Sequence, residues 1–119
     1  MAKILICDDE QEILDITKLI LEDSGHHVLA VTDSLMVENL IEKEMPDMLL
    51  IDLWMPNLSG DQVIKEVRKN PNITHLPVIV ISASKDVKEI AYASGADGFL
   101  EKPYDIDALL DIVEKHLMH

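Results

Sequence analysis

The sequence predicts one α/β domain with a parallel sheet, because strand-like and helical segments alternate five times along 119 residues. The strand-like segments are short, continuous apolar runs, as is typical of strands buried on both faces. A hydrophobic content of 48% supplies a full core, and an aromatic content of 3% makes that core aliphatic. We therefore expect a doubly wound, five-stranded sheet with five helices in a single domain over residues 1–119.

The expected strands carry polar groups where they end. They lie near residues 3–8, 27–32, 47–52, 77–82 and 97–101. Ligands of an open parallel sheet bind just beyond the carboxyl ends of its strands. Four of the runs would bring three carboxylates, a hydroxyl and an ammonium to that edge: Asp8, Asp9, Asp52, Ser82 and Lys102.

The first three expected helices have recognisable starts or stops. The first runs from about residue 10 to residue 24, stops at Gly25, and has an apolar face made of Ile13, Ile16, Ile20 and Leu21. The second follows Asp33 and Ser34. The third opens at Ser59, with Gln62 three residues later in the pattern of a capping box.

The last two expected helices differ in strength. The fourth, about residues 85–94, has few apolar positions, and Lys85 and Lys88 near its start oppose the helix dipole. Weakly anchored elements are the ones that move, so we expect the fourth helix to be the mobile one. The fifth opens at Asp105 and carries a clear apolar stripe at helical spacing.

Charge and composition exclude several classes of protein. A net charge of −13 leaves no basic surface for nucleic acid or anionic lipid. No apolar run approaches the roughly 20 residues of a membrane span, and the first ten residues lack the layout of a signal peptide. The single cysteine, Cys7, rules out an intramolecular disulfide. We expect a cytoplasmic protein that binds neither membrane nor nucleic acid directly.

The three acids predict a Mg²⁺ site. Carboxylates brought to ~4 Å repel one another by about 4 kcal/mol per pair at an effective dielectric near 20, and a cation between them removes that cost. Oxygen ligands suit Mg²⁺, and the lack of His or Cys ligands argues against zinc. A second interpretation stays open for Asp9, which could simply cap the first helix.

Asp52 follows the central run, so it should lie midway along the sheet edge. A carboxylate can attack phosphorus and form an acyl phosphate. Lys102 would add a positive charge from the neighbouring strand, and Ser82 could donate a hydrogen bond. Phosphoryl transfer requires little beyond such positioning and charge stabilisation.

Four segments together resemble the receiver domains of bacterial two-component response regulators, in particular single-domain chemotaxis regulators. They are Asp8-Asp9, the run Asp52-Leu53-Trp54-Met55-Pro56-Asn57-Leu58-Ser59-Gly60, the run Ile81-Ser82-Ala83, and residues 95–103 ending in Lys102-Pro103. Each segment is weak evidence alone, but all four occur in the family's order over the whole chain. The resemblance implies a flavodoxin-like fold with strand order 2-1-3-4-5.

The resemblance also implies roles for residues. Asp52 would accept a phosphoryl group from a phosphohistidine on a sensor histidine kinase or histidine phosphotransfer protein. Asp9, Asp52 and the Trp54 backbone carbonyl would bind Mg²⁺ directly, and Asp8 would act mostly through water. Ser82 and Lys102 would bind phosphoryl oxygens, Ser82 and Phe99 would switch together, and the bond before Pro103 would be cis.

Two residues near the pocket are expected to tune how long the phosphoryl group lasts. Trp54, two positions after the acceptor, should lean over the pocket and hinder the hydrolytic water, and it has no acceptor to orient that water. Ser84, two positions after Ser82, lacks a charge that would compensate. The resemblance further implies a phosphorylation-activated switch, not an enzyme acting on other molecules, with partner surfaces on the first helix and on the fourth helix, fifth strand and fifth helix.

Three other functions compete with a phosphorylation switch. A Mg²⁺-dependent phosphatase or phosphotransferase with an aspartyl phosphate is the main alternative, but haloacid-dehalogenase-like enzymes need a second Asp where Trp54 stands. A nucleotide or flavin module would need a Gly-rich or Ser/Thr-rich loop after the first strand, and a degenerate receiver would lack the complete acid set. The sequence leaves open whether a downstream protein or a missing output domain receives the signal.

Overall fold

The computed structural model describes residues 2–117 and contains one five-stranded parallel sheet. The strands are β1 (Lys3–Cys7), β2 (His27–Val31), β3 (Met48–Asp52), β4 (Val78–Ser82) and β5 (Gly98–Glu101). Their order across the sheet is β2-β1-β3-β4-β5, as expected. The register pairs Cys7 with Ile51, Asp52 with Ile81 and Ser82 with Glu101, so the carboxyl ends of the strands form one edge.

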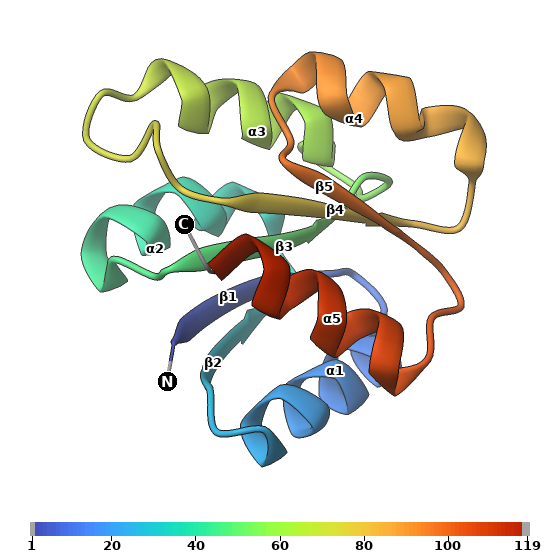
Figure 1. The fold of residues 1–119 in the computed structure, drawn as a ribbon. Helices are drawn as coiled ribbons and strands as arrows, with labels where there is room; N and C mark the ends of the chain where they lie inside the picture. The colour runs from blue at the N-terminus through green and yellow to red at the C-terminus, as the bar shows by residue number, and fades with distance from the viewer. Residues whose placement is uncertain (1, 118–119) are drawn as a thin grey trace.

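Helices follow each strand and cover both faces of the sheet (Figure 1). They are α1 (Gln11–Asp23), α2 (Val37–Glu44), α3 (Gly60–Lys69), α4 (Lys88–Ser94) and α5 (Ile106–Leu117). Short 3₁₀ turns, η1 (Ser34–Met36) and η2 (Lys85–Val87), precede α2 and α4. The expected fourth helix is therefore a 3₁₀ turn followed by only seven α-helical residues.

Two hydrophobic cores lie on opposite faces of the sheet. One packs side chains of α2, α3 and α4 against the sheet, and the other packs α1 and α5. The strand β3 is buried along its whole length, as its continuous apolar run predicted. Burial, with help from nearby carboxylates, raises the pKa of Cys7 to about 12, which fits the inert core thiol expected from its neighbours.

The expected apolar face of the first helix was partly wrong. The buried residues of α1 are Leu14, Thr17 and Leu21, whereas Ile16 is 59% exposed. The helix carries two adjacent apolar stripes, and the stripe containing Leu14 faces the sheet. The other stripe is left facing the connection between β5 and α5. The capping box at Ser59 is confirmed, since the Gln62 side chain accepts the Ser59 backbone N–H at 3.2 Å.

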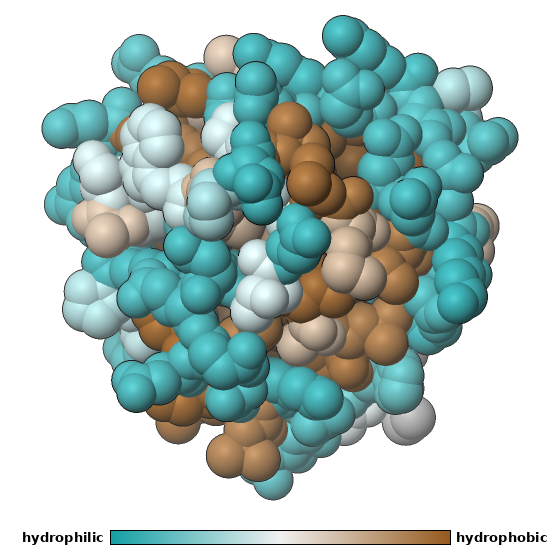
Figure 2. Space-filling model, turned by 180° about the vertical axis from the view of Figure 1, so that it is seen from behind, coloured by the Kyte–Doolittle hydropathy of each residue, from teal (hydrophilic) through white to brown (hydrophobic). Residues whose placement is uncertain are grey.

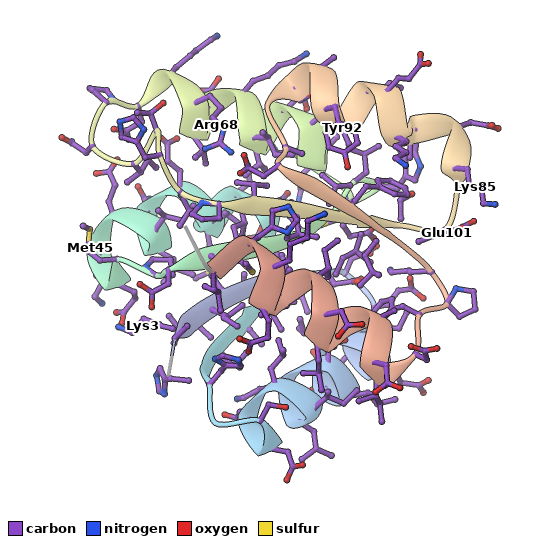
Figure 3. All side chains as sticks on the ribbon, viewed as in Figure 1. Lys3, Met45, Arg68, Lys85, Tyr92 and Glu101 are labelled. Atoms are coloured by element: carbon purple, nitrogen blue, oxygen red, sulfur yellow. The ribbon has the colours of Figure 1, made fainter. Side chains whose placement is uncertain are left out.

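Side-chain contacts tie the end of α4 to α3 more firmly than its start. Arg68 of α3 donates to the Gly95 carbonyl at 2.9 Å and to the Asp97 carboxylate at 2.9 Å, and it points between the helices and β5 (Figure 3). Near the start of α4, an ion pair joins Lys85 to Glu101 at 3.9 Å, and the Lys85 side chain is 79% exposed. The start of α4 is thus the less restrained end.

The surface is largely hydrophilic, in keeping with the acidic composition, but hydrophobic side chains form patches on the face seen from behind (Figure 2). No helix within residues 2–117 is long and apolar enough to cross a membrane.

Candidate functional site

The acids expected at the sheet edge do come together there. Asp8 follows β1 and is 2% exposed, and Asp52 ends β3 and is 5% exposed. Asp9 lies beside them at the surface. One carboxylate oxygen from each of Asp8, Asp9, Asp52 and Glu10 lies within 4.8 Å of all the others. The strands β1 and β3 are neighbours in the sheet, but the helix after β1 packs on one face and the helix after β3 packs on the other. The site lies between these two strand ends, which is the usual ligand position in such sheets.

Lys102 reaches into this cluster from the end of β5. Its Nζ lies 2.9 Å from Asp8 Oδ2, 3.0 Å from Glu10 Oε1 and 3.6 Å from Asp52 Oδ2. Burial works against the positive charge, but hydrogen bonds to Asp8 and Glu10 outweigh it and raise the pKa of Lys102. The ammonium is therefore held in its charged form beside the expected acceptor.

One ammonium does not balance the acids. Burial, together with the charges of Asp8 and Asp9, raises the pKa of Asp52 to about 6, although Lys102 and the Trp54 backbone N–H act in the opposite direction. Burial is the larger cause of this raised pKa, and the neighbouring carboxylates add to it. The four carboxylates of Asp8, Asp9, Glu10 and Asp52 share the one ammonium of Lys102, and this arrangement favours a further cation.

The donor set fits Mg²⁺. Asp8 Oδ2 is buried and, apart from its contact with Lys102, has no hydrogen-bond partner among residues 2–117. Its neighbours are carboxylate oxygens, and the only cysteine is buried within β1. Hard oxygen ligands on an open, partly hydrated edge are the arrangement in which proteins hold Mg²⁺.

Ser82 and Phe99 occupy the neighbouring strands. Ser82 ends β4 with no exposed surface, and its hydroxyl accepts the Ser84 backbone N–H at 3.3 Å. Ser84 in turn caps η2 by accepting the Asp86 N–H at 3.2 Å. Phe99 in β5 is half-buried against the core on the α4 side. Both expected switch residues thus border the η2–α4 segment.

The loop over residues 53–59 joins the acceptor to α3. Trp54 lies there with 58% of its surface exposed. Gly60 closes the loop by donating to the Leu53 carbonyl at 2.9 Å. A Cβ at position 60 would lie 2.4 Å from the Asp52 carbonyl oxygen, so only glycine permits this close approach. The Lys102–Pro103 bond is cis, as the resemblance implied.

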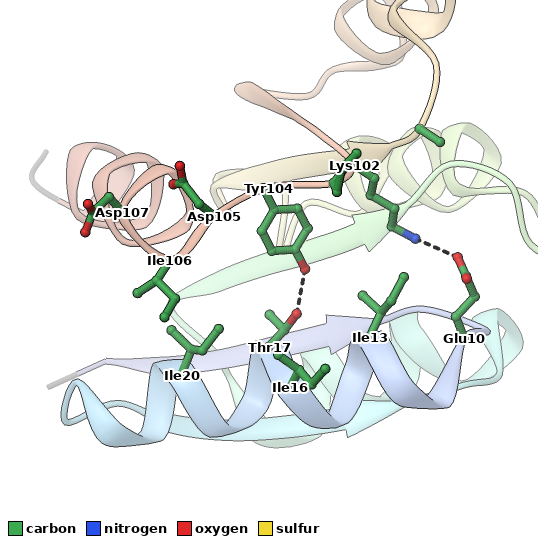
Figure 4. A pocket seen from close by; sticks show the side chains of 12 residues that line it. Glu10, Ile13, Ile16, Thr17, Ile20, Lys102, Tyr104, Asp105, Ile106 and Asp107 are labelled. Carbon is green, nitrogen blue, oxygen red and sulfur yellow. Dashed lines mark hydrogen bonds and ion pairs between the residues drawn. The ribbon is translucent and has the colours of Figure 1, made fainter.

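A groove of about 1000 Å³ runs beside the acid cluster, between α1 and the β5–α5 connection (Figure 4). Its walls include the exposed stripe of α1 and three residues after Lys102: Ile13, Ile16, Ile20, Pro103, Tyr104 and Ile106. The Thr17 and Tyr104 hydroxyls, 2.5 Å apart, join its two sides. Lys102 and Glu10 lie at the end nearest the acids.

Sequence reasoning missed two features of this site. Glu10 was assigned only to the start of the first helix, although it directly follows Asp8 and Asp9 and pairs with Lys102. The groove was also missed, because the Ile13, Ile16 and Ile20 stripe was interpreted as core. The signal for Glu10 was its adjacency to the acid pair, but a surface-exposed acid at a helix start has an equally simple structural explanation.

Comparison with known proteins agrees with this geometry. Residues 4–114 match the model of the response regulator receiver domain family. An uncharacterised 14.6 kDa protein of Leptolyngbya boryana is 31% identical over 117 residues, which cover 97% of this chain and 89% of that protein. The chemotaxis response regulator CheY4 of Vibrio cholerae is 27% identical, with a TM-score of 0.91 over 97% of this chain and 98% of that one.

Longer regulators also match. RpaA of Synechocystis, described as a DNA-binding dual master transcriptional regulator, is 30% identical over 112 residues. The alignment covers 92% of this chain but 46% of RpaA, so the chain spans less than half of that protein's length.

Proposed function

The chain belongs to the response regulator receiver family, and on that premise we propose that Asp52 accepts a phosphoryl group from a phosphohistidine and that this phosphorylation operates the switch. Receiver domains are regulatory components of two-component phosphorelays. The observation that carries the assignment of Asp52 is its position. It is a buried carboxylate 3.6 Å from the Lys102 ammonium and within 4.8 Å of three further acids.

The transfer needs little chemistry from the protein. An Asp52 oxygen attacks phosphorus, the new O–P bond forms as the P–N bond to the donor imidazole breaks, and the imidazole nitrogen keeps the electron pair and takes up a proton. Lys102, already charged, exchanges its contact with Asp52 for one with a phosphoryl oxygen. Ser82 donates its hydroxyl to a second phosphoryl oxygen from the adjoining strand.

Asp8, Asp9, Asp52 and the Trp54 backbone carbonyl are the groups that would hold Mg²⁺, with Asp8 acting mostly through water. When bound, the ion neutralises oxygens on the phosphoryl group and the repulsion among the acids. Support comes from the raised pKa of Asp52, at about 6, and from the buried Asp8 Oδ2, which has no polar partner among residues 2–117 other than the Lys102 ammonium.

The groove between α1 and the β5–α5 connection is the surface that would receive the phosphodonor. It opens beside Lys102 and exposes apolar side chains such as Ile16, at 59% exposed, and Ile106, at 56% exposed. An amphipathic helix that carries the phosphohistidine of a sensor kinase or phosphotransfer protein can lay its apolar face along such a groove. Its histidine would then reach Asp52 past Lys102.

The output would pass through Ser82 and Phe99 to η2, α4 and β5. When the Ser82 hydroxyl turns to the phosphoryl group, it gives up its bond to the Ser84 N–H, which precedes η2. Phe99 would turn inward beside it. The start of α4 is the less restrained end of that helix, so the surface of α4, β5 and α5 would change for a downstream protein or an output domain.

The test is phosphorylation by acetyl phosphate with and without Mg²⁺. The proposal expects one hydroxylamine-labile phosphoryl group per chain with Mg²⁺ present, and none when EDTA removes the metal. Labelling that resists hydroxylamine, or that is unchanged by EDTA, contradicts it. A synthetic phosphohistidine donor should behave in the same way, and Ile16→Glu in the groove should slow transfer from a phosphorylated kinase but not from acetyl phosphate.

A further inference from the structure

A buried serine outside the acid cluster contacts the loop that follows the acceptor. Ser34 opens η1, after β2, and is 2% exposed. Its hydroxyl donates to the Pro56 carbonyl at 3.3 Å and accepts the Leu58 backbone N–H at 3.2 Å. One hydroxyl therefore uses both its donor and its acceptor capacity on the same loop.

The two groups that Ser34 binds lie on either side of a backbone position with unusual geometry. Asn57 has a φ of 71°, in the left-handed region that few residues other than glycine adopt. The turn directs the carbonyl before Asn57 and the N–H after it to the same point, where neither can pair within a helix or strand. The Ser34 hydroxyl lies at that point and satisfies both groups.

Backbone hydrogen bonds hold the loop at its base and at its tip, in addition to the packing of Met55 and Leu58 against the core. At its base, Gly60 donates to the Leu53 carbonyl at 2.9 Å, where a side chain would collide with the backbone of Asp52. At its tip, Ser34 holds the Asn57 turn. Trp54, whose side chain is mostly in solvent, lies between these two points. Both contacts, together with the hydrogen bond from the Trp54 backbone N–H to Asp52, help to set the position of the Trp54 peptide.

We propose that Ser34 is a positioning residue for the phosphorylation site: it holds loop 53–59 so that the Trp54 backbone carbonyl is placed to bind Mg²⁺. The inference rests on the function proposed above for Asp52. Ser34 touches none of the reacting atoms and acts only through the Pro56 and Leu58 peptides. Mutation of a group that orients a metal ligand without binding the metal typically weakens metal affinity by about 10–100-fold. Ser34 acts on the ligand only indirectly, through two hydrogen bonds to the loop, so we expect a loss of about tenfold.

The test compares Ser34→Ala with Ser94→Ala. Ser94 is a matched control because it is also a buried serine, 6% exposed, but its hydroxyl bonds to the Ile90 carbonyl within its own helix. Without metal, hydrogen exchange followed by NMR should show the Leu58 amide of Ser34→Ala exchanging about tenfold faster than in wild type. In Ser94→Ala the Leu58 amide should exchange at the wild-type rate.

The second readout is Mg²⁺ binding, followed by Trp54 fluorescence. Ser34→Ala should bind Mg²⁺ about tenfold more weakly, and Ser94→Ala should bind it as wild type does. Acetyl phosphate labelling of Ser34→Ala should be slow at low Mg²⁺ and recover at saturating Mg²⁺. If Ser34→Ala does not fold, Ser34→Gly, which leaves no methyl group to bury, is measured in the same way.

The outcomes separate this inference from the function it rests on. Wild type that binds Mg²⁺ and is labelled, beside a Ser34→Ala variant with unchanged Leu58 exchange or unchanged Mg²⁺ affinity, overturns the role of Ser34 alone. Fast Leu58 exchange with weakened Mg²⁺ binding supports it. Wild type that takes up no phosphoryl group overturns the proposed function. The exchange experiment, done without metal or phosphodonor, still reports on the hydrogen bonds that Ser34 makes to the loop.

Discussion

Replacing Asp52 by Asn should stabilise the metal-free protein. The pKa of Asp52 is about 6, compared with 3.8 for an unperturbed carboxyl, so ionising it costs the fold about 3 kcal/mol at neutral pH. An amide of the same shape avoids that cost. Lys102 keeps partners in the variant, because Asp8 and Glu10 lie 2.9 and 3.0 Å from its Nζ. For a domain of this size we expect the melting temperature to rise by about 10 °C.

The sign of the pH dependence follows from the raised pKa. Above pH 6 the folded and unfolded states both carry the charge, and the full cost opposes folding. As the pH falls from 6 toward 3.8, the folded state takes up a proton before the unfolded state does, which stabilises wild type. The advantage of Asp52→Asn should therefore be largest near neutral pH and shrink steadily toward pH 4.

The assay is thermal unfolding followed by circular dichroism, in EDTA, at several pH values between 4 and 8. Asp9→Asn is the matched control, because Asp9 is at the surface, where water screens its repulsion, so its gain should be smaller. Added Mg²⁺ should reverse the order by stabilising wild type more than Asp52→Asn. An Asp52→Asn variant that melts no higher than wild type in EDTA, or by a margin that does not vary with pH, refutes the reasoning.

Three further results are expected. Lys102→Ala should lower the free energy of unfolding by about 3 kcal/mol, since it leaves buried carboxylates without their cation, and Mg²⁺ should restore part of the loss; unchanged urea denaturation would contradict this. Trp54→Asn should shorten the lifetime of the phosphorylated protein after donor removal, because a small amide can orient water where the indole shields phosphorus, and an equal or longer lifetime would show that it does not. Beryllofluoride, which mimics the phosphoryl group, should change hydrogen exchange around Ser82, η2, α4 and Phe99, and changes confined to residues 33–45 would show that the switch lies elsewhere.

The strands and the site edge could be predicted from the sequence because each depends on one local pattern. A short apolar run predicts a buried strand whatever packs around it. The expected strand bounds differ from the observed ones by at most one residue at each end. In a parallel sheet those ends must meet, so Asp8, Asp52 and Lys102 were placed together without knowledge of the helices.

The helix faces and the groove could not be predicted in this way. In α1, one apolar stripe contains Leu14 and Leu21 and another contains Ile13, Ile16 and Ile20, and periodicity alone does not say which faces the sheet. Likewise, the sequence placed Ser34 only just before the second helix. Its contact with the Asn57 turn depends on where a loop 24 positions later in the chain passes.

The central claim is that Asp52 is the phosphoryl acceptor, and intact mass spectrometry after incubation with acetyl phosphate and Mg²⁺ tests it most directly. Wild type should gain the mass of one phosphoryl group, and Asp52→Asn should gain none under the same conditions. Equal, hydroxylamine-sensitive labelling of wild type and Asp52→Asn would place the acceptor on another residue and contradict the account.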